Sequence, residues 1–230
     1  MQQDKTLAEL DDLESRTLGD IAVALPGATA VFRATGLDYC CGGQVTLRDA
    51  VAANALDLDK LVAELRSLDQ ESVFSPADLD TPTLTETIVT RFHRVHSKEI
   101  PELIQLAERV EVVHKDHPAV PAGLAALLQK MLGELTVHMQ KEEIVLFPQM
   151  CNGATMPLVF PITTMMAEHQ EHGGHLEDVR KLTKDLTVPE DGCPTWRALY
   201  AGLDKFAEDL VEHIHIENNI LFPRFLTKPA

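Results

Sequence analysis

One motif occurs twice in this chain, and this repeat restricts the fold more than any other feature of the sequence. The stretch 138–148 reads H-x3-E-x4-F-P, and the stretch 213–223 repeats this pattern 75 residues later. Each copy follows another histidine at nearly the same distance, since His93 lies 45 residues before the first copy and His169 lies 44 before the second. The chain therefore carries a His…His-x3-Glu unit twice, which predicts a doubled set of imidazole and carboxylate ligands between helices.

The two motifs lie on long stretches with the periodicity of bundle helices. Apolar or ligand-type residues recur there at alternating steps of four and three, which indicates one inward-facing stripe on each helix. The stripes run from Val89 to Val110, from Leu124 to Val145, from Leu158 to Val179 and from Leu199 to Ile220. Short connections that contain proline make neighbouring helices antiparallel. The sequence therefore predicts an all-α fold built on an up-down four-helix bundle.

A smaller helical module is expected before the bundle. Short helices are predicted over 18–25, 28–34 and 58–68. The string that begins at Thr46 resembles a capping box, with Asp in place of the usual Glu. Residues 70–83 are polar and contain two prolines, which is typical of a linker. We expect a small helical cysteine-containing domain at 1–75 and the four-helix bundle domain at 76–230.

Composition excludes several classes of partner. The chain has a net charge of −16 and a pI near 4.9, so its surface would repel nucleic acid and anionic lipid. No apolar stretch approaches the roughly 18 residues of a membrane span, and the start of the sequence lacks the pattern of a signal peptide. We therefore expect a cytoplasmic protein that binds neither nucleic acid nor membrane. Four cysteines are too few for a disulfide scaffold.

Histidine and glutamate within an apolar stripe point to a metal site, because burying them without partners is costly. A His-x3-Glu pair places both side chains on one face of a helix, one turn apart. A single such pair is usually an ordinary ion-paired surface, but two copies with partner histidines in register favour a metal. The predicted metal ligands are His93, His138, Glu142, His169, His213 and Glu217.

The types of ligand narrow the choice of metal. Imidazole and carboxylate without thiolate suit iron, manganese or zinc. Two carboxylates can bridge two ions, and two histidines per ion leave room for an oxo or hydroxo bridge and for open positions. This arrangement suits redox iron and small diatomic ligands, and it predicts a non-haem centre of two iron ions. The ferritin-type pattern, with Glu-x-x-His motifs on two helices and a Glu on each of the other two, is not found along these stripes.

Several histidines and glutamates near the stripes are not among the six predicted ligands. His96 and His172 lie one turn beyond two predicted ligands, and we interpret them as the wall of the pocket or as hydrogen-bonding support for it. Glu134 and Glu168 could orient a ligand imidazole or relay protons, or could be ordinary carboxylates. Four more histidines are expected on outer faces or at solvated helix ends, namely His175, His215, His114 and His117.

Adjacent thiols are the second unusual feature of the chain. Cys40 and Cys41 precede two glycines, which permit a tight turn. A helix that starts just after the turn would favour thiolate. Such thiols could bind a soft metal, react with an oxidant or transfer an ion or NO, or they could simply pack the turn. Cys151 and Cys193 are expected in loops as inert thiols.

These motifs together resemble those of the di-iron RIC proteins (repair of iron centres). The string L-D-Y-C-C-G-G at 37–43 is similar to the family's N-terminal signature, and the two His-x3-Glu motifs with their Leu-Phe-Pro endings are similar to its haemerythrin-like bundle. The resemblance covers roughly residues 17–226. It implies that the six predicted ligands bind two irons bridged by Glu142 and Glu217, and that Glu134 and Glu168 lie near the centre.

The resemblance also implies a function. Family members are implicated in repairing iron–sulfur clusters damaged by NO or peroxide, so this chain would donate iron to damaged iron–sulfur proteins, with Cys40 and Cys41 taking part. The alternative is an NO-binding sink or an NO reductase at the di-iron centre, so the sequence leaves open whether the protein is an enzyme. An O2 carrier or sensor fits less well, because a carrier has no use for the cysteine module. Homodimer formation is implied as well.

Overall fold

The structure is a computed structural model that describes residues 12–68, 75–153 and 157–226. Within these ranges every regular element is a helix, and the only strand-like pairing is a single bridge between Thr17 and Thr46. The predicted all-α fold is confirmed. Internal contacts divide the chain into two compact units, 80–213 on the one hand and 1–79 with 214–230 on the other. No helix of the described residues is long and apolar enough to cross a membrane.

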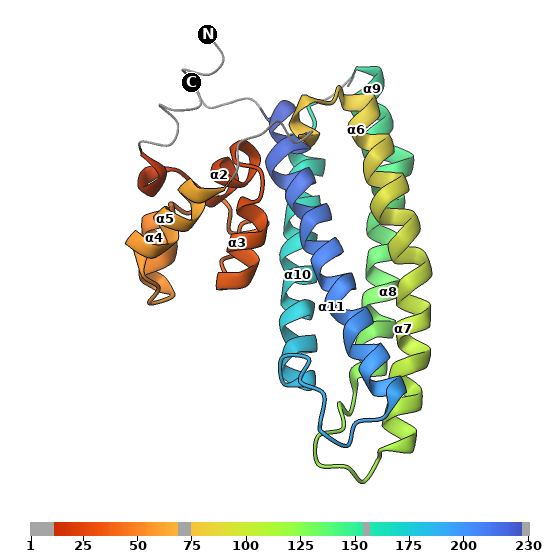
Figure 1. The fold of residues 1–230 in the computed structure, drawn as a ribbon. Helices are drawn as coiled ribbons and strands as arrows, with labels where there is room; N and C mark the ends of the chain where they lie inside the picture. Colours follow the sequence, from red (N-terminus) through yellow and green to blue (C-terminus); the bar gives the residue numbers. More distant parts are fainter. Residues whose placement is uncertain (1–11, 69–74, 154–156, 227–230) are drawn as a thin grey trace. The chain divides into compact units, whose positions relative to one another are not determined.

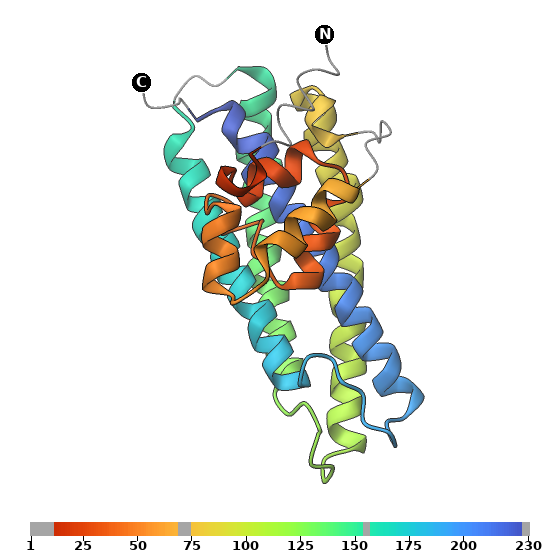
Figure 2. The same ribbon diagram turned by 60° about the vertical axis from the view of Figure 1, so that its left-hand side comes forward.

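The unit 80–213 contains the long helices of the bundle. Its elements are α6 (Thr81–Ile88), η3 (Val89–His93), α7 (Arg94–Val113), α8 (Leu124–Lys141), η4 (Glu142–Leu146), α9 (Phe147–Asn152), α10 (Val159–Thr183) and most of α11 (Pro194–His215). Figures 1 and 2 show α7, α8, α10 and α11 side by side, with successive helices running in opposite directions. The prediction of an up-down four-helix bundle is confirmed.

The predicted stripe is buried at every position on the third and fourth bundle helices but not on the first two. Every predicted stripe position from Leu158 to Val179 is buried. On the second helix, however, Val145 is 51% exposed and the next residue, Leu146, is only 3% exposed. On the first helix Ile88 is buried in place of Val89, which is only partly covered. The strict step of four and three is therefore wrong at these two places.

Turns of π-helix explain the shift of the stripe. The segments η3, η4 and η5 (Ile216–Leu221) are π-helical, and each π turn adds one residue to the α-helical repeat. Within η4, the N–H of Phe147 donates to the carbonyl of Glu142, five residues earlier. The N–H of Phe222 donates in the same way to the carbonyl of Glu217. The repeated E-x4-F spacing is thus the spacing of a π turn.

The other unit combines the N-terminal helices with the end of the chain. Its elements are η1 (Leu13–Ser15), α2 (Leu18–Ala24), α3 (Ala28–Thr35), α4 (Leu47–Ala53), α5 (Leu58–Ser67), η2 (Pro76–Asp78), η5 and η6 (Phe222–Arg224). As the capping box predicts, Thr46 Oγ1 accepts a hydrogen bond from the backbone N–H of Asp49 at 3.2 Å. The predicted linker 70–83 lies partly outside the described residues, and its last part is wrong because η2 and the start of α6 occupy it.

Candidate metal centre

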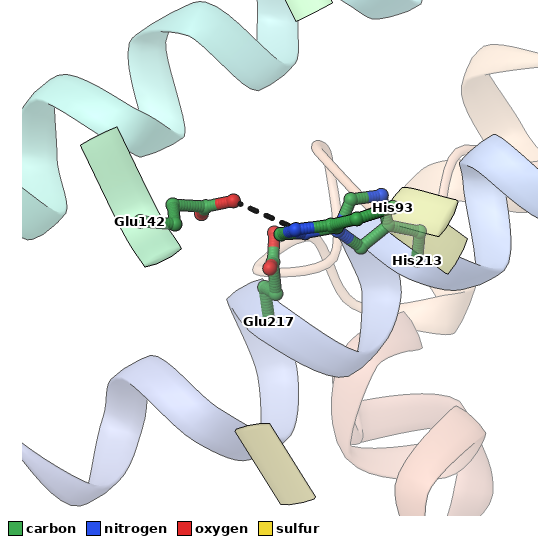
Figure 3. A group of neighbouring side chains, drawn as sticks. All are labelled: His93, Glu142, His213 and Glu217. Atoms are coloured by element: carbon green, nitrogen blue, oxygen red, sulfur yellow. Dashed lines mark hydrogen bonds and ion pairs between the residues drawn. The ribbon is translucent and has the colours of Figure 1, made fainter. Parts of the chain in front are cut away.

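The six predicted ligands converge into two groups that share both glutamates. One group is His93, Glu142, His213 and Glu217, and the other is His138, Glu142, His169 and Glu217. Within each group the ligand-type atoms lie within 4.8 Å of one another, and all six side chains are buried. Figure 3 shows the first group, with the Glu142 carboxylate reaching toward the imidazole of His93. Glu217 lies one turn beyond His213 on the helix that continues from α11 into η5.

The distances pair the histidines and place Glu142 between the pairs. The Nε2 atoms of His93 and His213 are 3.1 Å apart, and those of His138 and His169 are 3.0 Å apart. Glu142 Oε2 lies 3.4 Å from His93 Nε2, whereas its Oε1 lies 3.5 Å from His138 Nε2. Each oxygen of this carboxylate therefore faces a different histidine pair, which is the placement that a bridging ligand requires.

Two further carboxylates hold the imidazoles of His93 and His138 from outside. Glu143 Oε1 lies 3.0 Å from His93 Nδ1, and Glu168 Oε2 lies 2.9 Å from His138 Nδ1. An ionised carboxylate has no proton to donate, so the ring nitrogen that faces it must carry the N–H. In the neutral form of each ring the proton is therefore on Nδ1, and the lone pair of Nε2 points inward. Each carboxylate in turn binds a cation, since Glu143 accepts from Arg94 at 2.8 Å and Glu168 accepts from Lys141.

This donor set fits a cation. Four imidazole nitrogens and two shared carboxylates would be costly to bury among apolar side chains. The inward lone pairs of His93 and His138 face the Nε2 atoms of their histidine partners, and a cation could be bound by both rings of a pair and by the carboxylates at once. Imidazole with carboxylate and without thiolate suits first-row transition metals, iron among them. Three of the helices also carry a π turn at a predicted ligand, and such turns are frequent at functional sites.

Of the two other carboxylates predicted near the site, one contacts a predicted ligand histidine and the other does not. Glu168 contacts the ring of His138 rather than that of its sequence neighbour His169. Glu143, which was not among the residues predicted from the sequence, contacts the ring of His93. Glu134 Oε2 lies 2.7 Å from Nε2 of His175, whose side chain is 13% exposed. Glu143 directly follows a predicted ligand, and that adjacency was the only signal in the sequence.

His96 and His172 are buried in the bundle, and each ring packs against a predicted ligand histidine. Their four ring nitrogens have no hydrogen-bond partner among the described residues. Burial lowers the pKa of His96 to about 2 and that of His172 to about 4. Both rings are therefore neutral at pH 7.

The prediction that His215 faces outward is wrong. Its side chain is buried, its Nδ1 accepts a hydrogen bond from Asn219 Nδ2 at 2.9 Å, and its ring packs edge-on against Tyr39. Burial lowers the pKa of His215 to about 4. The reason is that residues 214–226 pack with the N-terminal helices. The ring of His215 therefore faces Tyr39 rather than solvent.

The cysteine turn is tightly held, and the predicted thiolate at Cys40 is wrong. The hydrogen bond with Cys41 and burial raise the pKa of the Cys40 thiol. The Sγ atoms are 3.6 Å apart, and with Asp38 they form a third group of side chains that could hold a metal. The next helix, α4, begins at Leu47, six residues after Cys41.

The end of the chain contributes to this turn. Asn218 Nδ2 donates to the carbonyl of Cys40 at 2.9 Å, and Asn219 Nδ2 donates to that of Tyr39 at 3.0 Å. A Cβ added at Gly43 would lie 2.5 Å from the Tyr39 carbonyl oxygen, so no larger residue fits there. The two asparagines directly follow Glu217, which connects the turn to a predicted ligand through adjacent residues of one helix.

Of the remaining cysteines, Cys193 lies in a loop as expected and Cys151 does not. Cys193 directly precedes α11, and His114 Nε2 lies 3.2 Å from its Sγ. Burial acts to raise the pKa of this thiol, but hydrogen bonds from His114 and from the backbone N–H groups of Trp196 and Thr195 outweigh it and lower the pKa to about 7. Cys151 lies within α9 rather than in a loop.

Comparison with known proteins agrees with this architecture. The model of the hemerythrin HHE cation binding domain matches residues 85–225, and ScdA_N, a domain of unknown function (DUF542), matches residues 14–69. The chain is 48% identical to iron-sulfur cluster repair protein YtfE of Musicola paradisiaca over 217 residues, which cover 94% of this chain and 98% of the relative. YtfE proteins of Yersinia pseudotuberculosis and Yersinia pestis are 47% and 46% identical over 218 residues, with the same coverage. The chain therefore belongs to the hemerythrin HHE cation binding family, within the group that these repair proteins form.

Proposed function

We propose that this protein binds two iron ions in the bundle and donates iron for the repair of iron–sulfur clusters damaged by nitrosative or oxidative stress. The observation that carries the proposal is the placement of Glu142 between two buried histidine pairs, with one oxygen toward each pair. The relatives that cover almost the whole chain are named iron-sulfur cluster repair proteins, which supports the same function here.

The proposed iron ligands are His93, His138, Glu142, His169, His213 and Glu217. Ferrous ions bound there would supply the iron that a damaged cluster lacks. The protein's own residues have three tasks: the imidazoles bind, Glu142 and Glu217 bridge, and the outer carboxylates keep the inward lone pairs of His93 and His138 available. An oxo or hydroxo bridge between the ions belongs to the same proposal.

We further propose that Cys40 and Cys41 take part in the release of iron. Together with Asp38 they form a group that could hold a cation, separate from the bundle's ligands. The raised pKa of Cys40 keeps it protonated until a metal displaces the proton, which suits brief rather than permanent binding. In this proposal the domain at 1–75 serves delivery and the domain at 76–230 serves storage.

The physiological setting is part of the same proposal. A cytoplasmic location and homodimer formation are consistent with a repair factor that meets many damaged iron–sulfur proteins. Both are testable apart from the iron chemistry, by localisation of the tagged protein and by sedimentation of the purified chain.

Repair is tested by mixing the iron-loaded chain, under strict exclusion of oxygen, with a [4Fe–4S] dehydratase whose cluster has been damaged by NO. The proposal expects dehydratase activity to return. The iron lost from the bundle should equal the iron gained by the dehydratase. The double variant Cys40→Ala with Cys41→Ala should retain its iron and transfer it more slowly. Activity that returns equally well with free ferrous iron at the same concentration would refute the donor role.

The alternative NO chemistry is separated by its product. Reduced iron-loaded protein is treated with NO and N2O is measured. Formation of N2O over several turnovers would make the protein an NO reductase, whereas a stable nitrosyl species without N2O is expected for a repair factor.

A further inference from the structure

Two buried histidines of the bundle are not used by the proposed function. His96 on α7 follows His93 by three residues and is 0% exposed, and His172 on α10 follows His169 by three residues and is 3% exposed. Their four ring nitrogens have no hydrogen-bond partner within the described part of the chain. Buried polar groups in native proteins nearly always have a partner, so this pair calls for a ligand that meets it.

Each of these rings touches a ligand histidine of a different group. The ring of His96 lies 5.5 Å from that of His213, which belongs to the first group. The ring of His172 lies 5.1 Å from that of His138, which belongs to the second, and meets it edge-on. The other aromatic neighbours of His96 are Phe92 and Phe206. The two histidines therefore lie beside both metal-ligand groups.

The two histidines are poorly placed to be metal ligands themselves. Among the described residues, neither belongs to a group of three or more ligand-type side chains close enough to hold an ion. A neutral imidazole carries one N–H donor and one acceptor nitrogen. Such a ring suits a hydrogen bond to a small molecule that occupies the layer next to the ions.

We propose that His96 and His172 hold a small anion of a few atoms against the two metal-ligand groups, by hydrogen bonds from their ring N–H groups. The negative charge of the anion is favoured by the bound cations, and its acceptor atoms are favoured by the two donors. This inference rests on the proposed metal centre, since the cations supply the attraction.

The test is an azide titration of the iron-loaded full-length chain, followed by the absorption of the metal-bound azide. Changing either residue to leucine, as His96→Leu or His172→Leu, is expected to weaken azide binding about tenfold, the effect of losing one hydrogen bond. His96→Gln and His172→Gln keep a donor and are expected to recover most of the affinity. His175→Leu, one turn further along α10, is the matched control and should leave azide binding unchanged.

Iron content is measured on every sample. Unchanged azide affinity in both leucine variants at full iron content would overturn the inference and leave the histidines as packing. Iron loss in the leucine variants would overturn it differently, by making the histidines metal ligands. A wild-type chain that binds no iron would refute the proposed function and this inference with it.

Discussion

Two layers of histidine lie one helical turn apart in the bundle, and they differ in what surrounds their nitrogens. In the first layer, His93 and His138 have a carboxylate on one ring nitrogen and a second imidazole facing the other. In the next layer, His96 and His172 are equally buried, yet their nitrogens have no hydrogen-bond partner in the described chain. All four residues lie at stripe positions of their own helices, so the stripe pattern alone does not distinguish them.

The difference lies in how the buried rings are oriented. An outer carboxylate fixes the proton on Nδ1 and directs the Nε2 lone pair inward, and Glu143 and Glu168 are placed to do this for His93 and His138. The rings of His96 and His172 have no such partner among the described residues. The following changes test this comparison, from the largest expected effect to the smallest.

Removing a shared carboxylate should have the largest effect. Glu142→Ala takes away the oxygens that face both histidine pairs, so we expect most of the bound iron to be lost while helicity stays unchanged. Glu217→Ala should behave in the same way. Glu134→Ala, on the same helix as His138 but paired with His175, is the control that should retain iron. Iron counts and circular dichroism of the four proteins decide the matter, and full iron in both bridging variants would contradict the assignment.

Removing an outer carboxylate should weaken the first layer without abolishing it. Glu143→Ala and Glu168→Ala are each expected to lower metal affinity by about 10–100-fold, the usual effect of losing a carboxylate that supports a ligand histidine. Glu168→Gln keeps an acceptor for His138 Nδ1 and should recover part of the loss. Competition with a coloured chelator measures these affinities. Equal affinity for the alanine variants and the wild type would mean that the outer carboxylates do not separate the two layers.

The π turn next to the first layer gives a prediction about stability. Leu146→Ala should cost about 2–4 kcal/mol of unfolding free energy because it empties a buried site. Val145→Ala, at the exposed neighbouring position, should cost no more than about 0.5 kcal/mol. Urea unfolding of the metal-free variants measures both values. The opposite order would mean that the helix keeps a plain α-helical register past Glu142.

A histidine outside both layers gives the smallest effect. The Cys193 thiol has its pKa lowered to about 7 by hydrogen bonds from His114 and two backbone N–H groups, against the effect of burial. Because a lowered pKa populates the thiolate at lower pH, alkylation of Cys193 should be half-maximal at pH about 7 and level off above it. His114→Ala should move this midpoint upward, and Cys193→Ser should remove the reaction. An identical midpoint with and without His114 would exclude the hydrogen bond as the cause.

Much of the fold was predictable from the sequence, because the stripes and the repeated motif report the inward face of each helix directly. Helix α10 follows the stripe throughout, so its buried residues and His169 could be predicted without the structure. The pattern fails where a π turn adds a residue, as at Val145, although the repeated E-x4-F spacing carried that information. Sequence patterns with a period of 3.6 do not reveal such turns.

The parts of the site that could not be predicted depend on contacts between distant segments. Glu168 supports His138, 30 residues away, and Glu143 supports His93, 50 residues away. The burial of His215 has a similar origin, since residues 214–226 pack with the N-terminal helices. No local pattern contains these pairings.

The central claim is that two histidine pairs and two shared glutamates form one centre for two irons. Its most direct test is to load the full chain anaerobically with ferrous iron and to count the metal per chain in the wild type, Glu142→Ala and Glu217→Ala. The account predicts about two irons in the wild type and about one or fewer in each variant. A wild-type chain that holds a single iron, or variants that hold as much as the wild type, would contradict it.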